Sequence, residues 1–495
     1  MKACLLLQRR FAYVGHKLAV ILKEKGCINE FCGYVYLRSS YEFLKNQKEI
    51  AYTSLLLDEE IHNQFKNEPL DLNYINKIEK EYGLPNLWPY ITVDRVVMYN
   101  MLVREYPYNT PKYTHEEMMR IFQVKSKAII SFLDREKPDI LIMVAVAGVG
   151  ATFLYYAAKK RGIKVLVLGE TRLGDGIIIS DNYLNFSWVE KIFSKLKKEG
   201  KQCEEVQAAR LYLEQFRQRP TTFFYDPKMK MTGDRSNQLK KLLPDKLFRS
   251  LFWFLKYTWG YFYKKGYNDY EEENPVTFFT DRLRRRIRSL IGFDFLYDAP
   301  NSDEDFAFFP LHLEPEVATL LFAPFWNDQI NLVRQIAKSL PLHFKLYVKE
   351  HPGMLGYRTH GYYRELKKIP NVKLINPKVS TFELIKNAKL ISVITSSVGW
   401  EAILLQKPII TFGDVFFNSL SSVKKCENIE RLPYLVKEQL ENFQHDEREL
   451  ENFIGIILQE SSAVGLTEIW ERGMEPSAEK ERLTKLANLI IKKIN

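Results

Sequence analysis

Three segments in the second half of this sequence follow apolar runs with side chains that could bind an anion. Each run is typical of a buried strand, and polar residues come directly after it, at 310–316 (PLHLEPE), 349–352 (KEHP) and 395–401 (TSSVGWE). The carboxyl ends of parallel strands meet at one edge of a sheet, where a crevice forms. Each of the three segments is therefore predicted to lie beside such a crevice.

The segment with two adjacent serines has the order expected of a phosphate site. Ser396 and Ser397 lie between an apolar strand and a helix that begins near Gly399. A helix start presents unpaired backbone N–H groups and the positive end of the helix dipole, which stabilise a phosphate. The alternative is that Ser396 only caps the helix. Glu401, about one turn into that helix, could accept hydrogen bonds from ribose hydroxyls or form an exposed salt bridge.

The neighbouring strand end carries an imidazole on a rigid turn, formed by His351 and Pro352. An imidazole can donate a hydrogen bond to a phosphate or carboxylate, although a single histidine is usually structural. Lys349 lies two residues earlier in the chain. With the Ser-Ser turn, two adjacent strand ends would then converge on one anion.

The elements that must position these residues alternate between strand and helix patterns, which predicts an α/β fold with parallel sheets. In the first half, the patterns predict strands at 3–7, 33–37, 140–146 and 164–168 and helices at 15–25, 115–135 and 151–161. In the second half, they predict strands at 306–311, 344–349, 372–375, 390–394 and 408–412 and helices at 326–340, 362–368, 381–387 and 399–405.

The chain is expected to divide into two doubly wound, Rossmann-like domains. At 495 residues it exceeds what one hydrophobic core usually supports. We predict an N-terminal domain at 1–195, a helical linker region at 196–304, a C-terminal domain at 305–430, and C-terminal helices at 431–495 that pack across the domain junction. The linker region contains an aromatic and basic stretch at 247–265 and five arginines at 282–288. It could pack at the junction or lie on anionic lipid.

Composition narrows the range of partners and compartments. The net charge of +11 favours an acidic partner. Nucleic acid is disfavoured as that partner, because no known reader motif is present. Five scattered cysteines without C-x-x-C spacing indicate a reducing compartment. Neither a signal peptide nor a run of roughly 20 apolar residues that could span a bilayer is apparent. We therefore expect a cytoplasmic protein, with peripheral attachment to the inner face of the membrane as the alternative.

Four motifs resemble the capsule polysaccharide biosynthesis family, which includes Kdo transferases. They are PLHLEPE at 310–316, Asp328-Gln329, VKEHP at 348–352 and ITSSVGWEAILLQKPIITFG at 394–413, so the resemblance is concentrated in 306–418. It implies a GT-B fold, in which two Rossmann-like domains face a central cleft. It also implies a glycosyltransferase of capsule or lipopolysaccharide-type synthesis that acts on a glycan or glycolipid acceptor.

The HP pair and the Ser-Ser turn are also similar to motifs of bacterial GT-B sialyltransferases that bind cytidine nucleotides. This similarity implies a CMP-activated donor of Kdo or another nonulosonic acid. His351, Pro352, Ser396 and Ser397 would then hold the CMP group. The predicted donor-nucleotide site as a whole comprises Lys349, His351, Pro352, Ser396, Ser397, Gly399 and Glu401.

Transfer to a sugar hydroxyl requires a general base, normally Asp or Glu. Glu170 and Asp175 follow a predicted strand of the N-terminal half, and Glu314 and Glu316 are rivals from the other half. The sialyltransferase pattern has adjacent acidic residues before a glycine, whereas here only Asp175-Gly176 matches. Asp175 could equally stabilise a turn. If the reaction retains the anomeric configuration, a simple base assignment does not apply.

We predict no metal and no cofactor, because His, Lys and helix N-termini can hold a leaving phosphate without a cation. Two alternatives to the CMP-sugar transferase remain. One is a GT-B transferase or epimerase that uses a UDP- or GDP-sugar. The other is a non-catalytic, membrane-associated assembly protein with a degenerate nucleotide cleft.

Overall fold

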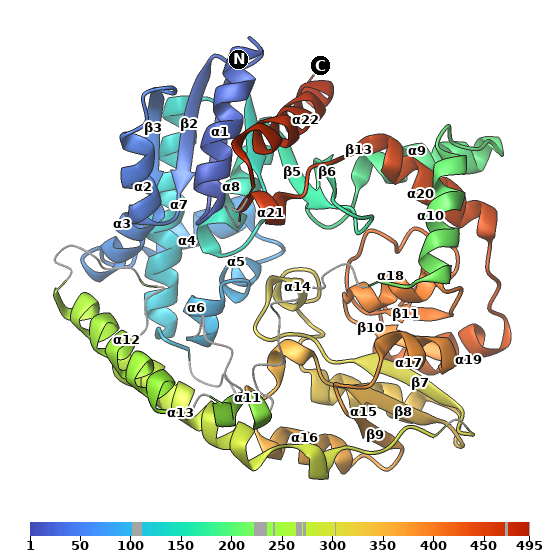
Figure 1. Ribbon diagram of the computed structural model, residues 1–495. Helices are drawn as coiled ribbons and strands as arrows, with labels where there is room; N and C mark the ends of the chain where they lie inside the picture. The colour runs from blue at the N-terminus through green and yellow to red at the C-terminus, as the bar shows by residue number, and fades with distance from the viewer. Residues whose placement is uncertain are drawn as a thin grey trace.

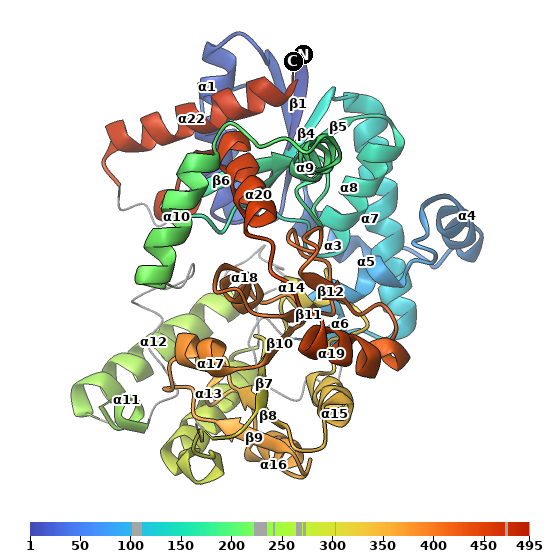
Figure 2. The same cartoon turned by 90° about the vertical axis from the view of Figure 1, so that its right-hand side faces the viewer.

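The computed structural model describes residues 1–494 apart from 101–110, 222–234, 241–242, 264–269, 271–273, 302 and 471–473. Two α/β halves, one above the other, make up the molecule (Figure 1). The chain ends lie near each other on the N-terminal half (Figures 1 and 2).

The N-terminal half contains a seven-stranded sheet in the order β13-β6-β5-β4-β1-β2-β3. Its parallel strands are β1 (Lys2–Leu7), β2 (Glu30–Val35), β3 (Tyr52–Leu57), β4 (Ile140–Met143) and β5 (Lys164–Glu170). The strands β6 (Gly176–Ser180) and β13 (Ser461–Ala463) are antiparallel additions at one edge. The order reverses between β1 and β4, which is the switch point of a doubly wound sheet.

Strand alternation explains why both faces of this sheet are covered. Leu5 and Leu7 pack on one face in a cluster with α1 (Phe11–Glu24) and α22 (Pro476–Ile494). Cys4 and Leu6 point to the other face, against α7 (His115–Glu136) and α8 (Val149–Lys160). Because successive strand residues face opposite sides, an all-apolar strand needs helices on both. The other helices of this half are α2 (Arg38–Lys45), α3 (Asp58–Asn63), η1 (Gln64–Lys66), α4 (Leu72–Tyr82), α5 (Trp88–Thr92) and α6 (Arg95–Tyr99).

The C-terminal half contains a six-stranded parallel sheet in the order β12-β11-β10-β7-β8-β9. The strands are β7 (Phe306–Pro310), β8 (Lys345–Lys349), β9 (Val372–Ile375), β10 (Leu390–Val393), β11 (Ile409–Thr411) and β12 (Val423–Lys425). The helices around it are η2 (Asp294–Leu296), α14 (Val317–Leu320), α15 (Gln329–Ser339), η3 (Pro352–Met354), α16 (His360–Lys367), α17 (Thr381–Asn387), α18 (Ser397–Leu404), η4 (Ile429–Arg431) and α19 (Leu432–Glu441). Phe306 and Phe308 pack on one face of the sheet, and Ala307 and Phe309 on the other.

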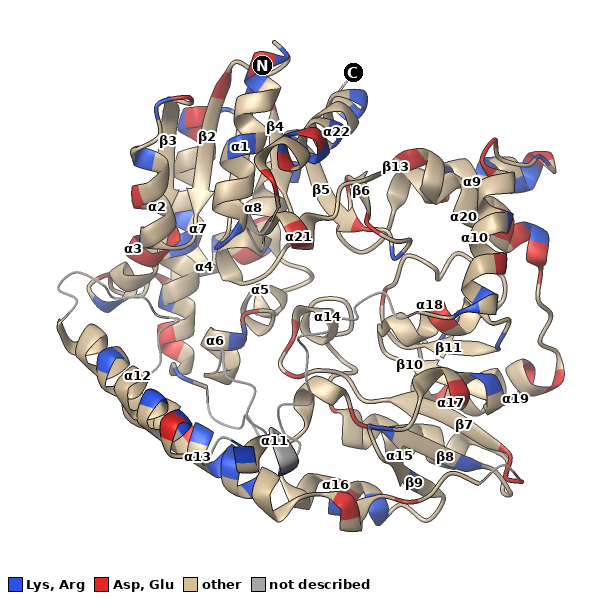
Figure 3. Cartoon of the chain, in the orientation of Figure 1, with Lys and Arg blue, Asp and Glu red and all other residues tan. Residues whose placement is uncertain are grey.

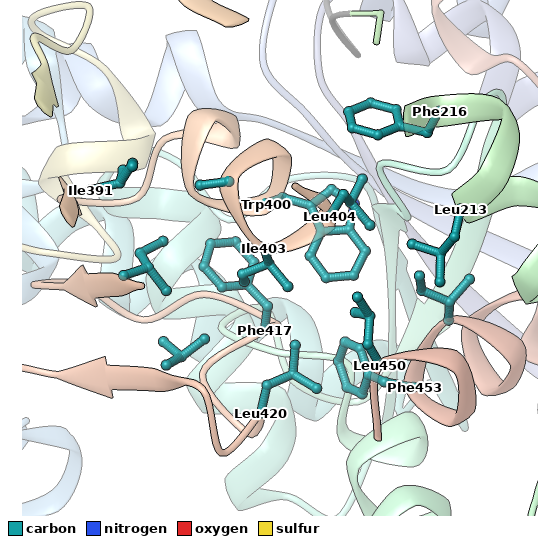
Figure 4. Close-up of a cluster of buried hydrophobic side chains, with 14 of the residues drawn as sticks. Leu213, Phe216, Ile391, Trp400, Ile403, Leu404, Phe417, Leu420, Leu450 and Phe453 are labelled. Atoms are coloured by element: carbon teal, nitrogen blue, oxygen red, sulfur yellow. The ribbon is translucent and has the colours of Figure 1, made fainter. Parts of the chain in front are cut away.

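The helices near the expected start of the linker region and the C-terminal tail pack against each other and against the two halves. The helices α9 (Ser187–Glu199) and α10 (Val206–Gln218) pack on α20 (Glu447–Glu460), and the expected boundary at residue 195 falls inside α9. Leu213 and Phe216 of α10 join Trp400 of α18 in one apolar cluster (Figure 4). The C-terminal tail is not entirely helical, because β13 pairs with β6 before α21 (Leu466–Trp470) and α22. It therefore crosses from the C-terminal half back to the N-terminal sheet.

Between α10 and η2, the expected linker region contains the described helices α11 (Arg235–Lys240), α12 (Pro244–Tyr263) and α13 (Pro275–Ile291). α12 and α13 run along one edge of the molecule, apart from both sheets (Figure 1). Within the described ranges, none of the helices combines the length and apolar content needed to cross a bilayer. The predicted fold class is confirmed: two doubly wound, Rossmann-like α/β halves with helices between them.

Candidate functional site

A pocket of about 400 Å³ lies between the two halves and is lined by both. From the N-terminal half, Glu170 at the end of β5 and Arg172 contribute to its wall. From the C-terminal half, Glu316, Ser396 and Ser397 do so. The carboxyl ends of two parallel sheets therefore face a common space, the arrangement in which open α/β sheets bind ligands.

The Ser-Ser turn lies at the pocket wall and starts α18. The Ser396 hydroxyl accepts a hydrogen bond from the Val398 N–H at 3.2 Å, so Ser396 is the cap of this helix. Capping and anion binding use the same end of a helix, and the positive end of the α18 dipole points to the pocket side. Gly399 has a packing role: a Cβ there would lie 2.8 Å from the Ile409 side chain and 2.9 Å from Val393.

His312 forms a hydrogen bond with the backbone of this turn, and the sequence analysis did not identify it as a site residue. Its Nε2 accepts a hydrogen bond from the Thr395 backbone N–H at 3.1 Å, which fixes the ring proton on Nδ1. Burial, with the nearby His351 and Arg358, lowers the pKa of His312 to about 3. The imidazole is therefore neutral at physiological pH. Its position directly after β7, within the PLHLEPE motif, was the signal that could have identified it.

Glu314 is engaged in a buried ionic network. The guanidinium of Arg358, fully buried, donates to Glu314 Oε2 at 2.8 Å, to the His312 carbonyl at 2.7 Å and to Glu350 Oε1. Burial raises the pKa of Glu314, while Arg358 opposes that shift. Glu314 does not line the interdomain pocket. Its carboxylate instead ties the end of β7 to the segment after β8.

His351 and Pro352 begin the short helix η3 at the end of β8. The His351 Nδ1 accepts the Gly353 N–H at 3.1 Å, which leaves the proton of the neutral ring on Nε2 as a donor. Pro352 occupies the first position of η3. Neither residue is in the pocket wall, although His351 is close enough to His312 to lower the pKa of that ring.

Lys349, the last residue of β8, and Glu401 of α18 are two buried ionisable residues close enough to influence each other. Lys349 Nζ donates to the Val379 carbonyl at 2.6 Å and to the Thr381 hydroxyl at 2.7 Å. Burial lowers the pKa of Lys349 to about 8 and raises that of Glu401 to about 8, and each charge partly offsets the shift of the other. Glu401 is only 2% exposed, and its Oε2 accepts no hydrogen bond. Glu401 is thus a buried residue of α18 and does not form an exposed salt bridge.

Glu170 lies in the pocket wall beside a cation. Arg172 Nη1 donates to Glu170 Oε2 at 2.9 Å, and Glu316 from the other half is near enough to raise the pKa of Arg172. Burial nevertheless lowers that pKa to about 10, so the guanidinium stays charged at neutral pH. Arg172 has a φ of 61°, a left-handed conformation that is uncommon outside glycine and is often found at functional sites.

Asp175 lies outside the pocket wall and contacts the C-terminal tail. Its carbonyl accepts the N–H groups of Val464 and Gly465, both at 3.0 Å, and its exposed carboxylate lies 4.0 Å from Arg482. Asp175 therefore attaches the C-terminal tail to the turn after β5. It is absent from the pocket wall.

Aromatic contacts across the halves were also missed by sequence reasoning. Phe186 stacks on Phe416 with ring centroids 4.7 Å apart, and Tyr183 stacks on Phe322 at 6.3 Å. All four rings line the pocket. Within the residues that the structure describes, no group of three or more His, Cys, Asp or Glu is arranged to hold a metal ion.

The fold and the pocket together define an α/β protein of two Rossmann-like halves, with its candidate site between them. Residues 257–422 match the family model of the capsule polysaccharide biosynthesis protein, which confirms the resemblance predicted from the motifs.

Two curated relatives match shorter parts of the chain. Protein FixF of Sinorhizobium fredii is 31% identical over 178 residues, which is 34% of this chain and 39% of that protein. The capsule polysaccharide modification protein LipA of Neisseria meningitidis serogroup B is 34% identical over 68 residues, 14% of this chain and 10% of that protein. The chain thus spans well under half the length of either relative.

Solved structures show a distant likeness. The beta Kdo 2,7 transferase of Thermosulfurimonas dismutans KpsC is 12% identical, with 67% of this chain and 89% of that chain covered and a TM-score of 0.34. The UDP-GlcNAc 2-epimerase of Methanocaldococcus jannaschii is 14% identical, with 93% and 100% covered and a TM-score of 0.25.

Proposed function

We propose that this protein is a glycosyltransferase of surface polysaccharide synthesis, of the capsule or lipopolysaccharide type. The observation that carries the proposal is the pocket in which the start of α18 in one half faces Glu170 and Arg172 in the other. A helix N-terminus suits a phosphate leaving group, and a carboxylate opposite suits an acceptor hydroxyl. The family match of 257–422 supports the pathway.

The donor in this proposal is a CMP-activated sugar, Kdo or another nonulosonic acid. The amides at the start of α18, with Ser396 and Ser397, would contact the nucleotide phosphate. His351 lies outside the pocket wall, and in this proposal it would donate from Nε2 to a nucleotide that extends beyond the pocket. Lys349 already donates to Val379 and Thr381, so we assign it and Glu401 to support of the turn rather than to contact with the nucleotide.

Glu170 is our candidate for the general base. It would take the proton of the acceptor hydroxyl while that oxygen bonds to the anomeric carbon, and the bond from the sugar to the CMP phosphate would break. Arg172 and the α18 N-terminus would stabilise the negative charge that develops on the phosphate. Glu314 is bound to Arg358 and Asp175 faces the C-terminal tail, so neither is positioned for this step. The acceptor would be a glycan or glycolipid at the cytoplasmic face of the membrane.

The test is thermal unfolding of the purified protein with CMP, CDP, UMP, UDP or GDP at millimolar concentration. A ligand at about 100 times its Kd adds ~2.7 kcal/mol to the stability of the native state, which raises the Tm of a 495-residue chain by about 2–3 °C. We expect CMP to raise the Tm of the wild type and of the control His343→Ala, whose ring is exposed, but not that of His351→Ala. A shift with UDP or GDP alone would overturn the donor assignment. No shift with any nucleotide would favour the non-catalytic assembly protein.

A further inference from the structure

The hairpin of α12 and α13 is held together by aromatic and cation–π contacts. Trp253 and Tyr257 pack on Phe278 with ring centroids 5.3 and 5.0 Å apart, and the Arg282 guanidinium lies 4.7 Å from the Trp253 ring. Residues earlier in α12 therefore meet residues later in α13, so the two helices are antiparallel. These contacts occupy one side of α12, which leaves its opposite side without a covering element among the described residues.

The open side of α12 is apolar. Phe248, Phe252, Leu255, Trp259 and Phe262 are spaced by four, three, four and three residues, which places them on one stripe of the helix. The four aromatic side chains among them are 65–72% exposed, so this stripe faces solvent. At ~200 Å² per ring, they alone leave roughly 500 Å² of apolar surface open, close to the largest patch of a typical monomer. The largest apolar patch of a monomer is often a functional surface, so this stripe is a candidate for contact with a partner.

The second helix repeats the pattern and adds charge. On α13 the exposed apolar residues are Val276, Phe279, Leu283, Ile287 and Ile291. The two helices contain eight Lys or Arg and two Asp, a net charge of +6 out of the +11 of the whole chain. One of the two acids, Asp281, is buried and paired with Arg285. Lysines and arginines gather along this edge in Figure 3.

We propose that the α12–α13 hairpin is a docking surface for an anionic lipid bilayer. Exposed Trp and Phe beside Lys and Arg suit the interface of a membrane, where rings enter the headgroup region and cations meet anionic lipid. The net charge of +6 favours a bilayer over a second protein, because an anionic leaflet attracts a basic surface as a whole and needs no matched acidic side chains. Arg249 and Lys256 flank the apolar stripe and could reach the headgroups around it. The proposal deepens the proposed function, on which it rests for the glycolipid acceptor.

The hairpin region is tied to both halves, so a bound bilayer would have a defined orientation relative to the pocket. Tyr270, between the two helices, donates from its hydroxyl to Asp58 Oδ2 in the N-terminal half at 3.0 Å. Arg288 of α13 donates to the Tyr357 carbonyl in the C-terminal half at 2.6 Å. Docking along this edge would present the interdomain pocket to acceptors held in the same membrane.

The test is co-sedimentation of the full chain with vesicles of phosphatidylcholine alone or with phosphatidylglycerol added. We expect strong binding only with phosphatidylglycerol and weaker binding at high salt, because screening reduces the attraction of surface charges. Phe252→Ser with Trp259→Ser should reduce binding about tenfold or more for each ring removed. Arg249→Gln with Lys256→Gln should reduce binding to anionic vesicles and leave the Tm unchanged.

The matched control is Phe325→Ser with Leu342→Ser, which removes two apolar side chains that are as exposed but lie outside the hairpin. This control should bind vesicles like the wild type. Equal binding by the control and the Phe252–Trp259 double variant would overturn the proposal. The proposal would also be overturned if the wild type formed a stable dimer in solution and did not bind vesicles, while the Phe252–Trp259 double variant was monomeric. The melting shift with CMP uses no lipid, so failure of the donor assignment and failure of the docking surface are separate results.

Discussion

Replacement of His312 by glutamine should remove part of the acid sensitivity of folding. Burial holds the pKa of native His312 at about 3, whereas an unfolded histidine titrates near its ordinary pKa of about 6.5. The folded pKa is depressed, so the unfolded state binds the proton first as the pH falls. His312 therefore contributes to stability in full above pH 6.5, and this contribution is lost progressively down to about pH 3.

The size of this loss of stability follows from the different protonation of His312 in the native and the unfolded state. Between pH 7 and pH 5 native His312 stays neutral while unfolded His312 becomes protonated, which costs about 2 kcal/mol at ~1.4 kcal/mol per pH unit below 6.5. Glutamine carries no proton to gain, and its side-chain oxygen can still accept the Thr395 N–H that His312 accepts at 3.1 Å. His312→Gln should therefore lose about 2 kcal/mol less stability than the wild type over this interval.

Urea unfolding at pH 7 and pH 5 measures this difference. The control is His343→Gln, which replaces an exposed histidine and should retain the acid sensitivity of the wild type. If His312→Gln and the wild type lose the same stability between the two pH values, His312 is not held neutral by its surroundings. The inference that a neutral His312 positions the Ser-Ser turn would then be wrong.

Three further substitutions test other parts of the site. Arg358→Met should destabilise the protein by about 3–5 kcal/mol in urea unfolding, because it leaves buried carboxylates without their cation; a loss below 1 kcal/mol would contradict the buried network. Glu170→Gln should lower kcat of sugar transfer by about 10²–10⁴ while nucleotide binding persists, and Asp175→Asn should stay near wild type; the reverse order would exchange their roles. Gly399→Ala should cost about 1–3 kcal/mol, because its Cβ would lie 2.8 Å from Ile409, whereas Gly361→Ala has room and should cost nothing measurable by thermal unfolding.

Local sequence predicted the framework of the C-terminal half well. The strand expected at 344–349 is β8 (Lys345–Lys349), and the one expected at 390–394 is β10 (Leu390–Val393). Continuous apolar runs with short polar loops predict buried parallel strands because both faces of such a strand are covered. Helix starts were less well predicted, since the helix expected from 326 begins at Gln329, where Asp328 caps it.

The elements that sequence patterns missed depend on distant partners. β3 and β6 were not predicted, and β13 is three residues long and exists through its pairing with β6, more than 280 positions away in the chain. The helices α9 and α10 were expected in or beside a linker region, but they pack on α20, where Arg210 pairs with Glu451. A periodic pattern shows that a helix has an apolar face and does not show which element covers it.

The amino-acid sequence by itself determined the α/β class, the doubly wound halves, the family resemblance and the position of the Ser-Ser turn at a strand end. Only the tertiary structure decided which acidic residues face the pocket. Glu170, Asp175, Glu314 and Glu316 look alike in sequence, yet only Glu170 and Glu316 are in the pocket wall. The physical reason is that the environment of a carboxylate depends on its neighbours in space: a buried Arg358 binds Glu314, and the returning C-terminal tail engages Asp175.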